Sequence, residues 1–347
     1  MRIRNLSKSL IALALVAIAA QSQSASGAKL TLGDIFVADF GLDAIVKVDA
    51  VTGDRTFVTG QGVGTGVTLS QPRGLAVDVR GSLIVSDASR RAVFRVDPIT
   101  GDRTIVSNNM TGLGPEFAVP FALAVRPNGD FYMTDVGLGA IFLVDAASGN
   151  RSVISSTTIG AGPILGNPTV LGLSPDGKLV VGDQRLNVLL EVDPASGNRT
   201  LISGGGVGTG PSVVSPLGMA FDLFNDILVS HNAQNILRVN SITGNRSIVS
   251  GGTIGSGVAF TDLRGLAREL SGQLLAVDED LDAVIRVDPQ TGLRTILSDA
   301  GHGLGPVFQT PEAIATVVHF VPEAEPIPQF AALVFAALAR RLTRIGR

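Results

Sequence analysis

The chain has 347 residues, of which 42 are glycine, and its formal net charge is −3. It contains no cysteine, no tryptophan and one tyrosine. The lack of cysteine excludes disulfides, thiolate metal sites and a cysteine nucleophile. A content of 45% hydrophobic and 16% charged residues is typical of a chain with a folded core. The scarcity of Trp and Tyr argues against a stacking platform for single-stranded nucleic acid.

Residues 1–28 have the pattern of a secretory signal peptide. The basic residues Arg2, Arg4 and Lys8 precede an apolar run of 11 residues, Leu10 to Ala20, and small and polar residues follow. The run is too short to span a bilayer, and the alternative is a buried helix. We predict that this segment directs export and is not part of the fold.

The middle of the chain repeats itself. One glycine of a recurring turn lies at Gly53, Gly101, Gly149, Gly197, Gly244 and Gly292, in steps of 48, 48, 48, 47 and 48 residues. A second glycine recurs with identical steps at Gly66, Gly114, Gly162, Gly210, Gly257 and Gly305. Two markers with one period indicate six copies of a structural unit.

Each repeat predicts four short strands, A to D. In the second copy they cover residues 74–79, 82–86, 92–97 and 103–107, which are rich in β-branched and apolar residues and are bounded by turn residues. Strands A and B carry consecutive apolar residues, as in Leu75-Ala76-Val77, so both faces of each sheet need cover. A period of this length with four strands indicates a β-propeller blade.

The two ends of the repeat region complement each other. The first repeat begins at a strand B over residues 34–38, and a lone strand A over residues 311–318 ends the series. We therefore predict an all-β fold over residues 29–320, a monomeric six-bladed propeller with four antiparallel strands per blade. The C-terminal strand completes the first blade and closes the ring.

In this topology the D–A and B–C loops share one face, and the A–B and C–D turns share the other. The C–D turn carries the motif Asp97-Pro98-Ile99-Thr100-Gly101, in which Asp accepts backbone amides and Gly adopts a positive φ. An arginine follows in every repeat, as Arg103 does here. We predict an Asp–Arg pair inside the hairpin.

Strand B ends at a polar residue in every blade: Asp39, Asp87, Asp135, Asp183, His231 and Asp278. Two interpretations stay open. Each side chain caps its own B–C turn, or carboxylates converge near the axis on a divalent cation such as calcium. The metal candidates are Asp39, Asp183, Asp278 and Glu312. The acidic run from Asp278 to Asp282 is either a calcium loop or a solvated loop.

Strand A begins at residues that differ between blades: Arg73, Phe121, Thr169, Leu217, Arg264 and Glu312. Because a ligand lacks sixfold symmetry, positions that break the repeat are candidates for binding. We predict a ligand-binding channel rim formed by Arg73, Asp87, Asp135, His231, Arg264 and Glu312. No catalytic residue is predicted, since no nucleophile motif is present.

The unit Pro72-Arg73-Gly74-Leu75-Ala76-Val77-Asp78 followed by Gly81-Ser82-Leu83-Ile84-Val85-Ser86-Asp87 resembles NHL-type repeats and the six-bladed TolB-like group. Gluconolactonases of that group bind a divalent metal through a strand-A Glu, two Asn and a strand-B Asp. The resemblance implies Glu312 and one strand-B Asp as ligands, whereas the Asn positions hold Arg, Phe, Thr or Leu here. The repeats are also similar to those of streptogramin lyases, and His231 or His302 would be the residue that indicates this relationship.

The C-terminus carries a Pro/Glu segment from Val321 to Pro326, an apolar stretch from Ile327 to Ala339, and Arg340, Arg341, Arg344 and Arg347. This order resembles the PEP-CTERM sorting signal of bacterial proteins. The resemblance implies that residues 321–347 are handled by exosortase-type machinery and contact the membrane. A plain membrane-tethering helix is the alternative.

Removing both ends changes the charge of the body. Of 27 basic residues, 3 lie in the signal region and 4 in the tail, and 2 of 30 acids lie in the tail, which leaves 20 against 28 and a net charge of −8. Such a body is a poor partner for nucleic acid. We expect an exported envelope, matrix or secreted binding or scaffold protein whose partner is an extracellular protein, glycan or small molecule. The alternative is a metal-dependent, lactonase-like hydrolase.

Overall fold

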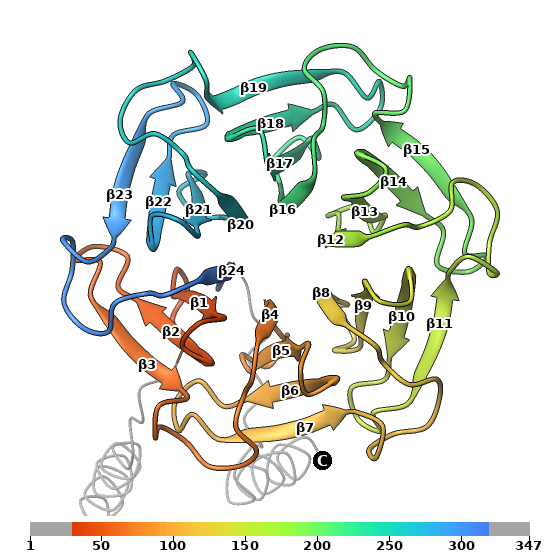
Figure 1. Cartoon of the computed structure of the whole chain (residues 1–347), viewed down its shortest axis with the longest axis horizontal. Helices are drawn as coiled ribbons and strands as arrows, with labels where there is room; N and C mark the ends of the chain where they lie inside the picture. Colours follow the sequence, from red (N-terminus) through yellow and green to blue (C-terminus); the bar gives the residue numbers. More distant parts are fainter. Residues whose placement is uncertain (1–29, 319–347) are drawn as a thin grey trace, which may run out of the picture.

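The computed structural model describes residues 30–318. Six four-stranded antiparallel sheets surround a central axis, which confirms the predicted six-bladed β-propeller (Figure 1). Every regular element in residues 30–318 is a strand, so this range holds no helix that could cross a membrane. The predicted signal peptide, residues 1–28, and the predicted sorting segment, residues 321–347, lie outside the described residues.

The strands occupy four positions in each blade. The innermost strands are β4 (Pro72–Val77), β8 (Pro120–Val125), β12 (Pro168–Leu173), β16 (Pro216–Phe221), β20 (Leu263–Arg268) and β24 (Pro311–Thr316). The second strands are β1 (Ile35–Asp39), β5 (Leu83–Asp87), β9 (Phe131–Asp135), β13 (Leu179–Asp183), β17 (Ile227–His231) and β21 (Leu274–Asp278). The third strands are β2 (Ala44–Val48), β6 (Ala92–Val96), β10 (Ala140–Val144), β14 (Val188–Val192), β18 (Asn235–Val239) and β22 (Ala283–Val287). The outer strands are β3 (Arg55–Thr59), β7 (Arg103–Ser107), β11 (Arg151–Ser155), β15 (Arg199–Ser203), β19 (Arg246–Gly251) and β23 (Arg294–Ser298).

The hydrophobic core lies between the blades. Six apolar clusters fill the six gaps, and each cluster joins two neighbouring blades. Phe36 of β1, for example, shares a cluster with Leu83 and Phe94 of the next blade. This packing explains why strands A and B lack polar alternation, because each sheet is covered on both faces.

The ring closes as predicted. Strand β24 pairs antiparallel with β1, from Ile35 opposite Thr316 to Asp39 opposite Pro311. Beyond the strands, the Gly33 amide donates to the Val317 carbonyl at 2.8 Å, and the Val317 amide donates to the Asp34 carbonyl at 3.0 Å. The first blade is thus built from both ends of the repeat region.

The predicted Asp–Arg pair inside the C–D hairpin is wrong. Asp97 does accept the Ile99 and Thr100 amides, and Gly101 has φ 75° as expected. The side chain of Arg103, however, crosses to the D–A loop of the preceding blade, where Nε donates to the Val67 carbonyl and Nη1 to the Val63 carbonyl, both at 2.9 Å.

This contact is a latch between blades that recurs around the ring. The same bonds to the preceding loop are made by Arg55, Arg103, Arg151, Arg199, Arg246 and Arg294. The D–A loops and C–D turns were predicted to lie on opposite faces, but at the outer edge of the propeller they are in contact. The outer strands run around the circumference and bring each turn to the neighbouring loop (Figure 1).

Candidate functional site

The strand-B aspartates are fully buried turn caps. All five, Asp39, Asp87, Asp135, Asp183 and Asp278, have 0% exposure. Asp87 is representative: Oδ1 accepts the Arg90 amide of its own B–C turn at 2.8 Å, and Oδ2 accepts the Ser70 amide at 2.5 Å. Each of the five carboxylates thus ties its B–C turn to the D–A loop that precedes strand A or, for Asp39, β24.

This placement separates the predicted site residues. Asp87 and Asp135 of the predicted rim are buried beneath it, because backbone amides engage their carboxylates. The metal candidates Asp39, Asp183 and Asp278 face their own loops in the same way. Within residues 30–318, no three His, Cys, Asp or Glu side chains gather closely enough to hold a metal ion. The residues therefore do not fit the divalent metal that the gluconolactonase resemblance implies.

His231 takes the place of the sixth aspartate. The ring is 1% exposed, and Nε2 lies 2.6 Å from Oδ1 of Asn235 across the B–C turn. Burial lowers the pKa of the imidazole, and the bond to Asn235 opposes this shift. His302 lies elsewhere, in a D–A loop, with Nδ1 2.7 Å from Asp299 Oδ1. His231 ends β17 and contacts its own B–C turn through its ring, as a turn-stabilising residue does.

Each innermost strand has a bulge near its start, at the residues that differ between blades. In β4, Pro72 opposes Asp87 and Gly74 opposes Ser86, so Arg73 has no partner in the ladder. In β24, Pro311 and Ala313 are paired and Glu312 is skipped. Bulges redirect side chains at functional sites. Here the skipped residues from different blades meet at the axis, where Arg73, Phe121, Thr169, Leu217 and Glu312 line a cavity of about 120 Å³.

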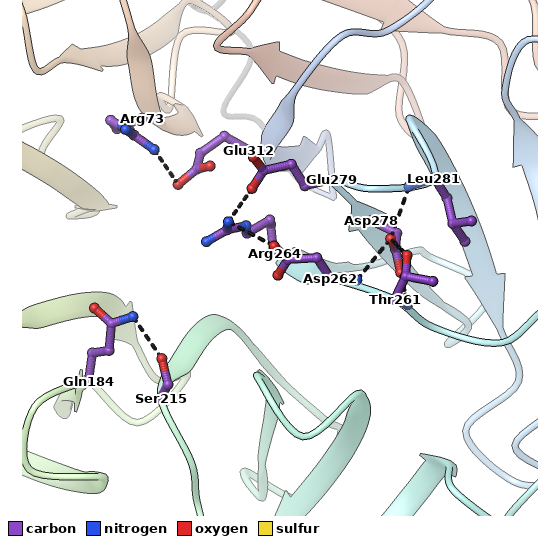
Figure 2. A network of polar contacts seen from close by, with 10 residues as sticks. All are labelled: Arg73, Gln184, Ser215, Thr261, Asp262, Arg264, Asp278, Glu279, Leu281 and Glu312. Atoms are coloured by element: carbon purple, nitrogen blue, oxygen red, sulfur yellow. Dashed lines mark hydrogen bonds and ion pairs between the residues drawn. The ribbon is translucent and has the colours of Figure 1, made fainter.

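Two arginines and three carboxylates form one group at this end of the axis, which we call the axial charged cluster: Arg73, Asp262, Arg264, Glu279 and Glu312 (Figure 2). Arg73 Nη1 lies 3.1 Å from Glu312 Oε1. Arg264 Nη2 lies 2.9 Å from Asp262 Oδ2 and also pairs with Glu279. Three predicted rim residues, Arg73, Arg264 and Glu312, are thus brought together.

Aromatic rings hold Arg73 in place. Its guanidinium carbon lies 4.1 Å from the centre of the Phe40 ring and 5.7 Å from that of Phe121. Such cation–π contacts stabilise a guanidinium without neutralising its charge. Arg73 therefore keeps its hydrogen-bond donors directed at the cluster.

Glu312 has an acceptor that nothing satisfies. The residue is 6% exposed, and its Oε2 has no hydrogen-bond partner within residues 30–318. Burial raises the pKa of this carboxyl, Arg73 and Arg264 lower it, and Glu279 raises it further. Burial likewise raises the pKa of Asp262. An unsatisfied buried acceptor costs free energy, so a donor supplied by a ligand is favoured there.

Phe40 and Asp262 were not among the predicted site residues. Phe40 follows the strand-B aspartate, where the other blades hold Ala88, Val136, Gln184, Asn232 and Glu279. Asp262 precedes strand A, where they hold Gln71, Val119, Asn167, Ser215 and Thr310. Both positions break the repeat, so the same signal that identified Arg73 and Glu312 would have found them.

No known family profile matches the sequence, and no curated protein matches it. Solved structures share the fold at low identity. A chain of a nidogen/laminin complex has 16% identity and a TM-score of 0.63, covering 83% of this chain and 99% of its own. A protein of unknown function from Bacteroides caccae has 15% identity and a TM-score of 0.57, covering 82% and 98%. Virginiamycin B lyase from Staphylococcus aureus has 15% identity and a TM-score of 0.50, covering 70% and 73%.

Proposed function

We propose that the chain is an exported binding or scaffold protein of a bacterial envelope or extracellular matrix, and that it holds its partner at the axial charged cluster. The partner is an extracellular protein, glycan or small molecule that presents amine or hydroxyl donors. The observation that carries the proposal is the buried Oε2 of Glu312 at the axial cavity, which has no hydrogen-bond partner in the described part of the chain.

The charge balance supports a partner that donates hydrogen bonds. Three carboxylates face two guanidinium groups in the cluster. Asp282 nearby adds another buried oxygen, Oδ1, that has no hydrogen-bond partner among residues 30–318. Burial, together with the charges of Asp39 and Glu279, raises the pKa of this carboxyl. Carboxylates therefore outnumber guanidinium groups, although Arg264 Nε is also without an acceptor within residues 30–318, and an ammonium or hydroxyl group would stabilise the excess negative charge.

The test is a calorimetric titration of the full chain with oligosaccharides that bear amines, only hydroxyls, or carboxylates. We expect the amine-bearing series to bind most tightly and Glu312→Gln to weaken it about tenfold or more, since charge-assisted hydrogen bonds contribute about 1.5–3 kcal/mol. The matched control is Glu116→Gln, an exposed glutamate away from the axis. Equal affinity of wild type and Glu312→Gln would refute the site.

Export is tested separately by fractionation of bacterial cells that express the chain. Deletion of residues 1–28 is expected to keep the protein in the cytoplasm. Deletion of residues 321–347 is expected to release it from the envelope into the medium. An unchanged distribution after the first deletion would contradict export by this segment.

A lactonase-like hydrolase is the alternative proposal, although residues 30–318 gather no three side chains that could hold the divalent metal of that class. One observation favours it, the raised pKa of Glu312, because a carboxyl with a raised pKa in a cavity is typical of catalytic acids and bases. Turnover of any of a panel of lactones, lost in Glu312→Gln, would support it. A protein without turnover on the whole panel would exclude it.

A further inference from the structure

The opposite end of the axis carries a second, larger cavity, which we call the apolar funnel. It has a volume of about 640 Å³, within the range of small-molecule sites. The ends of all six innermost strands line it, through Val77, Val125, Leu173, Phe221, Arg268 and Thr316. The axial charged cluster lies at the starts of these strands, so the two sites are distinct.

Two arginines, Arg126 and Arg268, line the funnel, and the carboxylate and hydroxyl groups of its wall are already engaged. Asp78 Oδ1 accepts the Arg80 amide at 2.9 Å and the Ser82 amide at 2.8 Å within its own turn. Thr316 Oγ1 donates to the Arg268 carbonyl at 2.9 Å. The remaining surface is aliphatic and aromatic, which suits a hydrocarbon chain.

The side chain of Arg268 is half-buried, and it forms no ion pair with any carboxylate of residues 30–318. Other arginines at this end of the axis do form ion pairs. The distances are 3.6 Å from Arg126 Nη1 to Asp130 Oδ2, 3.1 Å from Arg238 Nε to Asp222 Oδ2, and 2.6 Å from Arg286 Nη2 to Glu269 Oε1. The other five blades place an uncharged residue at this position. Of the two arginines that line the apolar funnel, only Arg268 therefore has no carboxylate at ion-pair distance within residues 30–318.

We infer that the apolar funnel binds a single-chain amphiphile with an anionic head, specifically a long-chain carboxylate. The hydrocarbon chain packs against the walls formed by Val125, Leu173 and Phe221. The carboxylate pairs with the guanidinium of Arg268, whose forked donors match both oxygens. This pairing neutralises a charge for which residues 30–318 supply no carboxylate partner.

The experiment titrates the full chain with dodecanoate below its micellar concentration, and in parallel with dodecyltrimethylammonium and with butyrate. Dodecanoate is expected to bind at least tenfold more tightly than either, and Arg268→Gln is expected to remove most of that advantage. Arg80→Gln is the control, because Arg80 is exposed, belongs to an A–B turn of the same face and does not line the funnel.

The headgroup comparison needs no variant, so it stands even where a substitution disturbs folding. Equal binding of the cationic and anionic amphiphiles, or unchanged dodecanoate affinity in Arg268→Gln, would overturn the proposal. Uptake of dodecanoate only after removal of residues 319–347 would also overturn it, since the chain's own C-terminal segment would then be the occupant.

Discussion

The aspartates at the ends of the second strands accept hydrogen bonds from backbone amides. The strand-B carboxylates are buried, and amides of two loops donate to all five, joined at Asp278 by the Thr261 hydroxyl. Burial raises the pKa of Asp87 to about 6, against the opposing effect of the Ser70 and Arg90 amides. A residue that organises turns thereby also makes stability depend on pH.

We predict the direction of that dependence. A carboxyl whose pKa is raised by folding binds its proton more tightly in the native state, so its contribution is full below about pH 4 and is lost as pH rises through 6. The rise from 3.8 to about 6 corresponds to about 3 kcal/mol. Asp87→Asn should flatten the pH profile of the unfolding free energy over this window. A profile that keeps the wild-type slope would contradict the assignment.

The arginines that form the latch between blades predict a second effect on stability. Arg103 donates to carbonyls of the preceding blade from a side chain that is nearly buried, and Arg103→Ala leaves these acceptors without donors. We expect a loss of about 3 kcal/mol in denaturant unfolding. Arg103→Lys should lose less, because it keeps the charge but not the forked donors.

The control for this latch is Arg80→Ala, since Arg80 is exposed and makes no contact of this kind. Its effect should stay within about 0.5 kcal/mol. An Arg103→Ala protein as stable as this control would show that the latch adds nothing to the ring.

At the scale of the strand, the closing strand is equivalent to the other innermost strands. Ile314 of β24 and Leu266 of β20 are 6% and 5% exposed and both line the axial cavity. Ile314→Ala and Leu266→Ala should therefore each cost about 3 kcal/mol, as buried aliphatic truncations do. A much smaller loss for Ile314→Ala would mean that β24 is detached in solution.

The sequence predicted the strands because repetition averages out local ambiguity. Period, turn glycines and unbroken apolar runs placed every blade, and β7 has its predicted bounds. Strand β4 begins at Pro72, two residues earlier than predicted, because the bulge pairs Pro72 with Asp87. Turn signals carry no information about a bulge, so the redirection of Arg73 could not be predicted.

At the scale of the molecule, the site proved less predictable than the ring. Sequence reasoning selected Arg73, Arg264 and Glu312 because they break the repeat. It could not pair Arg73 with Glu312, since the bulges that skip both residues in the strand ladders leave no signal in the sequence. It also could not see that Arg103 bonds outside its own hairpin, because that depends on the twist of the outer strands (Figure 1).

Circular permutation of residues 30–318 tests how the ring is held. Gly33 and Val317 are hydrogen-bonded, so a short linker can join the ends. One permuted protein is opened in the A–B turn at Leu223 and Phe224, which are 78% and 85% exposed. Its new N-terminus begins with β17 and its new C-terminus ends with β16, so one blade is again built from both ends of the chain. Opening the D–A loop at Met110, 94% exposed, leaves every blade continuous. The second protein should melt at least about 5 °C lower. Equal melting temperatures would show that the shared blade does not stabilise the ring.

The pairing of β1 with β24 also sets the order of events during synthesis. The first blade cannot gain its innermost strand until residues 311–316 have been made, so any shorter nascent chain exposes the edge of β1. Contacts between such distant residues form late, because the loop they close is nearly the whole chain. For a protein proposed to cross a membrane, this delay keeps the chain open during translocation and leaves ring closure to the far side.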